Sequence, residues 1–322
     1  MKKTLHIFFE YALFLFLITL SIILTCSNKF QGVILEGVSL WFFNVLPALF
    51  PFSVITAIIS SLSITSKLSL KLSPLTKRVF RINGTVGYAF IMSVLSGYPI
   101  GAKLVCSLKE NGLLSKTESV RASVVCSTSS PSFLIACVGA KLFNDLTFGV
   151  CLFACHILSV ILTGFLFRFY KPNDPCTLPT SLSKKKVDNV FYESVFSSVL
   201  SSLTVCGIIT VFYLLIEVLL SFGVLSPLIR LFSLPFNESG KAFTLGLFEC
   251  TKGLRKLSLN GINRLSLPLS CFLCSFGGLS VIMQSIAFLK KAKIKTAPFL
   301  VSKILSAVFA FFLGFIFNLI LY

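Results

Sequence analysis

The residues with the most chemical potential in this sequence are polar groups inside long apolar runs. The first half contains "SGYPIGAK" (96–103) and "CSTSSPSF" (126–133), and the second half contains "LFECTKGLRK" (247–256) and "CSFGGLSV" (274–281). Glycine and proline allow or force a helix to break, and hydroxyl, carboxyl and amino groups can hydrogen-bond a solute. We call these stretches breaks one to four. Their composition predicts non-covalent binding of a polar solute.

The expected substrate-binding residues are the glycines and polar residues of these breaks. In the functional interpretation, Lys103, Glu249 and Lys252 line a polar solute site or form a gating pair, and hydroxyl and amide groups form its walls. In the alternative interpretation, Lys103 extends to the cytoplasmic headgroups and the hydroxyls only satisfy broken backbone. The full expected set is Ser96, Gly97, Tyr98, Gly101, Lys103, Ser127, Thr128, Ser129, Ser130, Glu249, Thr251, Lys252, Ser275, Gly277, Gly278, Ser280 and Gln284.

Two further features have open alternatives. Glu217 stands alone in a strongly apolar run, where it is either a proton-coupling carboxylate or a residue near the outer interface. The pair Gly277 and Gly278 either breaks a helix or lets two helices pack closely in lipid.

No catalytic constellation is visible. The sequence has no serine with a nearby histidine and acid in one motif, no GxxxxGK loop and no paired carboxylates at a membrane face. Cys271 and Cys274 have the spacing of a redox or metal-binding pair, but no second ligand pair accompanies them, and His6 and His156 are distant in sequence. We therefore expect no enzyme activity, cofactor or metal, and we expect most of the 11 cysteines to act as small hydrophobic residues.

The elements that hold these breaks must lie in a membrane. Of the 322 residues, 55% are hydrophobic and 12% are charged, which is too little charge to cover a water-soluble domain. The 29 Lys and Arg residues exceed the 11 Asp and Glu residues, but they cluster between apolar runs, as topology signals and headgroup contacts do. The composition predicts a polytopic protein of the cell membrane that binds no nucleic acid.

Two spans are expected before break one. Residues 5–27 predict an uncleaved first span, and a signal peptide ending near Cys26 is the alternative. Residues 38–62 predict a second span, which Pro47 and Pro51 should kink.

Breaks one and two interrupt the next segments. A polar, basic connection at 63–82 leads to residues 84–112, where neither side of break one is long enough to cross the hydrocarbon. This predicts a re-entrant hairpin. Residues 117–143 predict a span that unwinds at break two, and residues 146–169 predict an ordinary span.

The second half repeats this plan after a hydrophilic linker. In chain order we expect a span at 191–222, a loop with Pro227 and Arg230, a second hairpin around break three, a span broken at break four, and a final span at 297–321. "SPLTKRVF" (73–80) corresponds to "SPLIRLF" (226–232), break one to break three, and break two to break four. Each repeat crosses the membrane three times, so the two repeats must be inverted relative to each other.

The predicted fold is therefore an all-α polytopic membrane protein with seven spans and two re-entrant hairpins. Its expected units are an N-terminal transmembrane helix (1–34), a first repeat (35–170), a cytoplasmic polar linker (171–190) and a second, inverted repeat (191–322). With the N-terminus inside, 20 of the 29 basic residues fall on cytoplasmic segments. This predicts a cytoplasmic N-terminus and an extracytoplasmic C-terminus.

Taken in order, the four breaks resemble those of the sporulation integral membrane proteins of endospore-forming bacteria (YlbJ type). These proteins belong to the nucleoside-recognition or Gate-domain group, which is similar in architecture to the concentrative nucleoside transporters. The likeness covers roughly residues 35–322 and is most specific in the first half, with Phe-Pro-Phe in the kinked span, then break one, then the Ser/Thr-rich break before proline. In break three, Cys250 stands where a small hydroxyl or aliphatic residue is expected.

The resemblance implies two Gate-like repeats and a role in making the spore, at the cortex stage. It does not supply a substrate. Together with the breaks, it leads us to expect a transporter-like protein that binds and moves a small polar solute. The alternative is a non-transporting scaffold for cortex assembly, with other sporulation membrane proteins as partners besides the lipid bilayer. Under that alternative, replacing Lys103 or Glu249 would leave spores normal.

Overall fold

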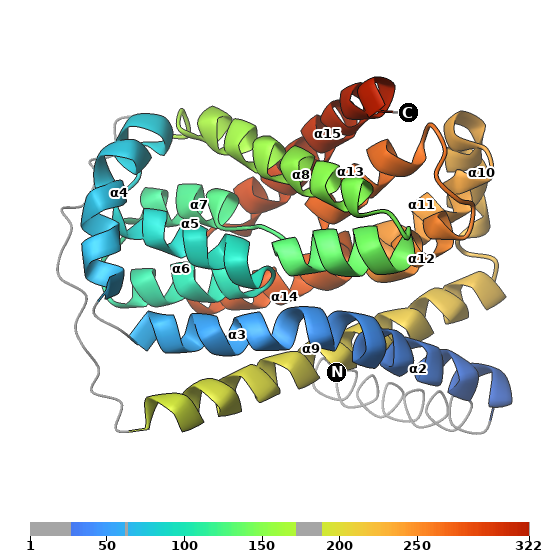
Figure 1. The fold of residues 1–322 in the computed structure, drawn as a ribbon, viewed down its shortest axis with the longest axis horizontal. Coiled ribbons are helices and arrows are strands. Elements are labelled where there is room, and N and C mark those ends of the chain that lie inside the picture. Colours follow the sequence, from blue (N-terminus) through green and yellow to red (C-terminus); the bar gives the residue numbers. More distant parts are fainter. Residues whose placement is uncertain (1–26, 62–63, 172–188, 322) are drawn as a thin grey trace, which may run out of the picture.

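The computed structural model describes residues 27–61, 64–171 and 189–321, and every regular element among them is helical. The expected first span at 5–27 and most of the expected linker lie outside the described residues. The elements in chain order are α2 (Asn28–Leu40), η1 (Trp41–Val45), α3 (Leu46–Ser61), α4 (Ile64–Phe80), α5 (Thr85–Ser96), α6 (Ile100–Glu110), α7 (Lys116–Val125), η2 (Ser132–Leu142), α8 (Leu146–Phe167), α9 (Val190–Ser221), α10 (Ser226–Phe236), α11 (Ser239–Phe248), α12 (Cys250–Ser258), α13 (Ser266–Phe276), α14 (Gly278–Lys291) and α15 (Thr296–Leu321) (Figure 1).

Five helices in the described part of the chain are long and apolar enough to cross a membrane. They are Asn28–Ile59, Leu146–Phe167, Val190–Ser221, Ser266–Lys291 and Thr296–Ile320. A sixth candidate is the pair Lys71–Phe80 and Thr85–Ser96, which bends by 89°. The expected broken span at 117–143 does not form one long helix, because break two divides it into helices of 10 and 11 residues.

The second span begins earlier than expected. It runs without interruption from Asn28 to Ile59, with a π-helical turn, η1, that ends two residues before Pro47. Because Pro47 has no amide hydrogen, the carbonyl of Phe43 loses its usual partner four residues later. Lys141 Nζ donates to this carbonyl at 3.1 Å, so η2 supplies a replacement hydrogen bond.

Two expected connections, one a polar stretch and the other a loop, contain helices. The basic connection at 63–82 forms α4 over Ile64–Phe80, and the expected loop around Pro227 and Arg230 forms α10. Pro227 lies in the first turn of α10, where its missing amide hydrogen breaks no helical hydrogen bond. Aromatic contacts hold α10 in place, since Phe232 and Phe243 have ring centroids 4.9 Å apart. Packing against α11 therefore supports the helix at α10.

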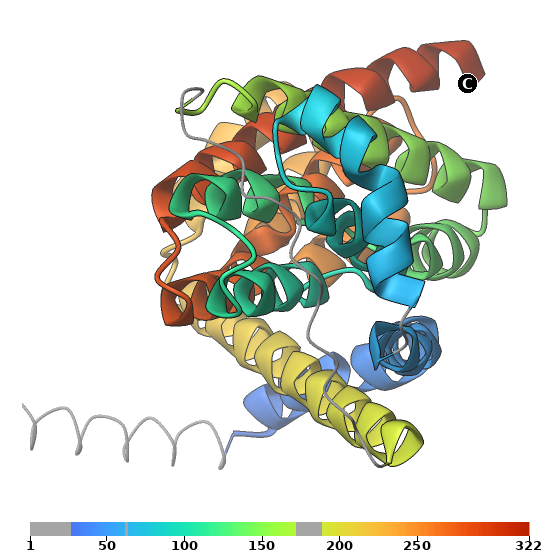
Figure 2. The same ribbon diagram turned by 90° about the vertical axis from the view of Figure 1, so that its left-hand side faces the viewer.

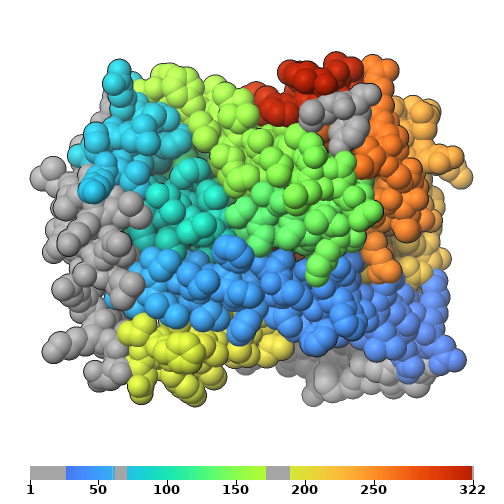
Figure 3. Space-filling model, viewed as in Figure 1, coloured from blue at the N-terminus to red at the C-terminus, as the bar shows by residue number. Residues whose placement is uncertain are grey.

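The helices form a bundle resting on a crossed layer. Helices α2 and α3 cross α9 on one side, and the remaining helices pack over this layer (Figures 1 and 2). In the space-filling view, α2 and α3 form a blue ridge along one face (Figure 3). Phe43 and Val211 of this layer are 66% and 60% exposed, as lipid-facing side chains would be.

Small residues bring the inner helices close together. A Cβ atom on Gly139 of η2 would lie 2.4 Å from the Cα of Gly149 in α8, so the two backbones touch. Membrane helices pack in this way because lipid provides no hydrophobic drive for association. The short helix η2, which begins after break two, is thereby held against the long helix α8.

Candidate functional site

All four breaks meet at one cavity of about 70 Å³. Break one contributes Gly97 and Tyr98, and break two contributes Ser129 and Ser130. The residues from breaks three and four and from the helix that follows are Glu249, Cys250, Thr251, Cys274, Gly277, Ser280, Val281 and Gln284. The remaining wall is apolar and comes from the crossed layer and η2, namely Val45, Leu49, Phe133, Val205 and Ile209.

Nine of the 17 residues expected at the site line this cavity. They are Gly97, Tyr98, Ser129, Ser130, Glu249, Thr251, Gly277, Ser280 and Gln284. Of the others, Ser96 lines a neighbouring cavity of about 20 Å³. Lys103 is exposed on α6 and Lys252 is half-buried. The buried residues outside the cavity wall are Gly101, Ser127, Thr128, Ser275 and Gly278.

Break one is seated directly on break two. A Cβ atom on Gly101 would lie 1.8 Å from the carbonyl oxygen of Cys126, so no larger residue fits there. Ser93 Oγ donates to that same oxygen at 2.6 Å and lies 2.7 Å from Thr128 Oγ1. Gly97 has a φ of +74°, a conformation that favours glycine. These contacts satisfy backbone that has left the helix, as membrane burial requires.

His156 joins break two to break four. Its Nε2 accepts a hydrogen bond from the backbone amide of Ser129 at 2.9 Å. The ring proton of the neutral imidazole therefore lies on Nδ1, which is 2.8 Å from Ser275 Oγ and donates to it. The side chain is fully buried in α8. No role for His156 was predicted from the sequence, where the available signal was a histidine inside an apolar span.

Lys303 joins the last span to break one. It is 2% exposed, and its Nζ donates to Tyr98 Oη at 2.6 Å and lies 4.4 Å from the centroid of that ring. Tyr98 Oη in turn donates to the carbonyl of Ser127 at 3.0 Å. Among the described residues, Lys303 forms no ion pair. Sequence reasoning placed this lysine in the last span without recognising a partner, because the partner is 205 residues away.

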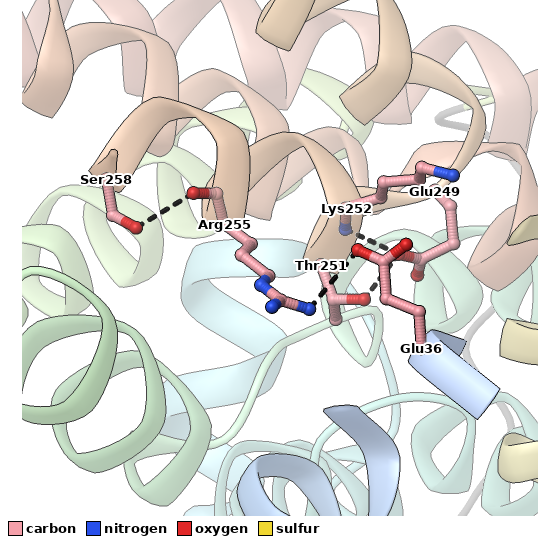
Figure 4. A network of polar contacts seen from close by, with 6 residues as sticks. All are labelled: Glu36, Glu249, Thr251, Lys252, Arg255 and Ser258. Atoms are coloured by element: carbon pink, nitrogen blue, oxygen red, sulfur yellow. Dashed lines mark hydrogen bonds and ion pairs between the residues drawn. The ribbon is translucent and has the colours of Figure 1, made fainter. Parts of the chain in front are cut away.

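Glu249 terminates the helix before break three and caps the helix after it. Its Oε2 accepts from the Lys252 amide at 2.8 Å and from Thr251 Oγ1 (Figure 4). A carboxylate at this position satisfies free amides and complements the positive end of the α12 dipole. The Lys252 ammonium lies 4.5 Å from the Tyr213 ring centroid, and Arg255 pairs with Glu36 of α2 at 3.2 Å (Figure 4).

The structure also places Glu217 and the pair Gly277 and Gly278, for which the sequence left two interpretations open. Glu217 pairs with Lys29 at 2.8 Å, with side chains 18% and 56% exposed, and it does not line the cavity. Gly277 and Gly278 have φ values of +86° and +72°, so they interrupt the helix at break four. Within the described residues, no group of three or more His, Cys, Asp or Glu side chains could hold a metal ion.

Comparisons with known proteins show what the chain is similar to. Residues 42–145, which include breaks one and two, match the Gate family model, described as nucleoside recognition. The chain is 27% identical over 302 residues to the sporulation integral membrane protein YlbJ of Bacillus subtilis (strain 168), covering 85% of this chain and 74% of that protein. No solved structure matches the chain. The resemblance expected from the breaks is thus confirmed: this integral membrane protein is similar to a sporulation protein and contains a nucleoside-recognition (Gate) match in its first half.

Proposed function

We propose that this protein binds a small polar solute at the meeting point of the four breaks and moves it across the membrane. The observation that carries this proposal is the convergence of breaks up to about 180 residues apart on one cavity. Non-helical backbone at membrane depth is tolerated where it lines a cavity or is buried in protein. Discontinuous helices that meet at a midplane site are typical of secondary transporters.

The lining of the cavity suggests the kind of solute. The crossed layer and η2 contribute apolar side chains, whereas the breaks and the helix after break four contribute hydroxyl, carboxylate and amide groups. Ser280 Oγ is buried and has no hydrogen-bond partner among the described residues, and a solute or a water molecule would satisfy it. A cavity of about 70 Å³ holds a few water molecules. A solute with an apolar face and a polar edge would therefore require the breaks to move apart.

The paired breaks also support the expected inverted repeats. In the first half, α5 and α6 flank break one, and α7 and η2 flank break two. In the second half, α11 and α12 flank break three, and α13 and α14 flank break four. The proposal includes two re-entrant hairpins, one formed by α5 and α6 and the other by α11 and α12. It also places the N-terminus on the cytoplasmic side of the membrane and the C-terminus on the extracytoplasmic side. Cysteine accessibility on each face of sealed vesicles would test this orientation.

Ligand-induced stabilisation of the purified protein tests solute binding. A panel of nucleosides, amino acids, dipicolinate and cell-wall precursors would be added to protein in detergent, followed by a thermal unfolding scan. A ligand at a hundredfold excess over its Kd should stabilise the folded state by about 2.7 kcal/mol. Gln284→Ala should abolish the effect, and Gly207→Ala, with nothing within 4 Å of the added methyl group, serves as the matched control. A panel without any effect would favour the non-transporting scaffold.

The similarity to the Bacillus protein supports a role in spore formation, and we place that role at the cortex stage. Expression of this chain in a Bacillus strain that lacks YlbJ should restore heat-resistant spores. Gly101→Ala, which collides with Cys126, should fail to restore them, and Gly207→Ala should succeed. Equal spore counts with and without the unmodified chain would contradict this part of the proposal.

A further inference from the structure

Basic side chains gather where α4 meets the end of α8. Phe80, the last residue of α4, packs on α8 so closely that a Cβ atom on Gly164 would lie 2.8 Å from its ring. Arg81 and Arg168 directly follow the two helices, and their guanidinium carbons each lie 5.6 Å from the centroid of the Phe169 ring. Two cations from distant parts of the chain therefore lie beside one aromatic side chain.

Arg121 of α7 fixes this arrangement from the inside. Its side chain is 3% exposed, and it donates to the backbone carbonyls of Arg81, Tyr170 and Lys171. Arg81 and Lys171 have φ values of +53° and +45°, a conformation that residues with a side chain rarely adopt. Their carbonyls thus point inward to Arg121, while both of their side chains are exposed.

Within the described residues, no acidic side chain pairs with these cations. The carboxylate of Glu118 in α7 is directed inward, because it is 1% exposed and accepts from two backbone amides. The Nε of Arg168 is buried and has no hydrogen-bond partner in the described part of the chain. An anion would satisfy this group and offset the mutual repulsion of the cations. We call the cations on this surface the basic cluster, namely Lys77, Arg78, Arg81, Arg168 and Lys171.

The depth and the surroundings of the basic cluster match those of a lipid headgroup. Helix α8 is an apolar span of 22 residues, so Arg168 lies where the hydrocarbon ends. The Lys71–Phe80 part of α4 bends by 89° from α5 and runs across one end of the bundle (Figure 1), as a helix in the membrane interface does. Over the three turns before Arg168, α8 exposes an apolar stripe whose side chains are 43–45% exposed, namely Leu158, Leu162, Phe165 and Leu166.

We propose that an anionic phospholipid binds here, with its phosphate between Arg81 and Arg168 and its acyl chains along the exposed stripe of α8. Guanidinium groups suit a phosphodiester because they donate paired hydrogen bonds in a fixed geometry. A zwitterionic lipid carries an ammonium group that the basic cluster repels, so the site favours an anionic headgroup. Binding of this lipid is independent of whether a solute is moved, and it can be tested without knowing the solute.

Photolabelling of the unmodified chain locates the lipid. The full-length protein in detergent receives phosphatidylglycerol or phosphatidylcholine with a diazirine in one acyl chain, and trypsin cleaves it after illumination. Peptide 142–168 carries the exposed stripe of α8, and peptide 304–322 carries most of α15, where Phe312 and Ile316 are 60% and 52% exposed. The phosphatidylglycerol probe should label 142–168 at least about fivefold more than 304–322, because the basic cluster holds its headgroup. Equal labelling of the two peptides, or an equal preference of the phosphatidylcholine probe for 142–168, would overturn the proposal.

Removal of both arginines tests the role of their charge. Phosphatidylglycerol should raise the Tm of the unmodified protein, whereas phosphatidylcholine and inorganic phosphate should not. In R81Q/R168Q, the midpoint of this stabilisation should move to about tenfold higher lipid concentration, because two charge-assisted donors are lost. K290Q/K295Q, which removes two exposed charges at the end of α14 and directly after it, is the matched control and should keep the midpoint unchanged.

Three results of these scans would contradict an anionic-lipid site. They are an unchanged midpoint in R81Q/R168Q, an equal shift in both double variants, and equal stabilisation by inorganic phosphate. The labelling of the unmodified chain decides the proposal whether or not R81Q/R168Q folds.

Discussion

Tyr98→Phe removes a single oxygen atom that joins the last span to breaks one and two. That oxygen accepts a hydrogen bond from Lys303 Nζ and donates one to the Ser127 carbonyl. The aromatic ring remains in the variant, so the contact between ring and ammonium is retained. A hydrogen bond to a charged group contributes about 1.5–3 kcal/mol, and a neutral one contributes about 0.5–1.5 kcal/mol. We expect the variant to lose about 2–4 kcal/mol of unfolding free energy.

Lys303→Met isolates the charged half of this contact. Lys303 is 2% exposed and forms no ion pair among the described residues, and replacing a buried charge by an apolar side chain of similar length is often neutral or stabilising. The variant should therefore unfold within about 1 kcal/mol of the unmodified protein, or later. In this background, Tyr98→Phe removes only the bond to Ser127 and should reduce stability by about 1 kcal/mol.

A double-mutant cycle measured by thermal unfolding in one detergent tests this reasoning. For a chain of this size, 1 kcal/mol corresponds to about 2 °C in Tm. In the unmodified protein, Tyr98→Phe should lower the Tm by about 4–8 °C. In the Lys303→Met variant, the same substitution should lower the Tm by about 2 °C. Equal Tm shifts in the two backgrounds would refute the coupling, and an unchanged Tm for Tyr98→Phe alone would refute the contact itself.

Three other substitutions test the remaining contacts between the breaks. Gly101→Ala places a methyl group 1.8 Å from the Cys126 carbonyl and should prevent accumulation of folded protein on a size-exclusion column, whereas Gly207→Ala, with open space around it, should leave the yield unchanged. His156→Phe strands the Ser129 amide and should reduce stability by about 1–3 kcal/mol, which a Tm equal to that of the unmodified protein would contradict. Glu249→Gln removes the charge at the start of α12 but keeps an acceptor, so we expect a loss of about 0.3–2 kcal/mol in the same scan.

The breaks could be read from the sequence because their cause is local. Glycines that need positive φ, as Gly97 and Gly277 do, and a run of hydroxyl residues before Pro131 interrupt a helix whatever packs around them. Their pairing across the two halves then predicted that they would share a site. The residues lining the cavity come from all four breaks, which supports that prediction.

The contacts that hold the breaks together could not be read in the same way. His156 and Lys303 act on residues 27 and 205 positions away, and no pattern within either span indicates such a partner. Lys103 was expected at the site because it belongs to break one, but its side chain is exposed on α6. Short-range chemistry therefore indicated the breaks that line the cavity, whereas the hydrogen bonds of His156 and Lys303 to these breaks depended on the packing of α8 and α15.

Tyr98 connects the stability of the protein with the shape of its interior. It lines both the 70 Å³ cavity and the neighbouring 20 Å³ cavity, as do Val45, Leu49 and Val205, so its ring forms part of the wall between them. The hydrogen bond from Lys303 holds that ring in place. Because an unpaired ammonium in this setting is unfavourable, any movement of Tyr98 that joins the two cavities must give Lys303 another acceptor. Under the proposed function, the polar groups of a bound solute or of entering water supply that acceptor, and occupancy of the cavity favours movement of Tyr98.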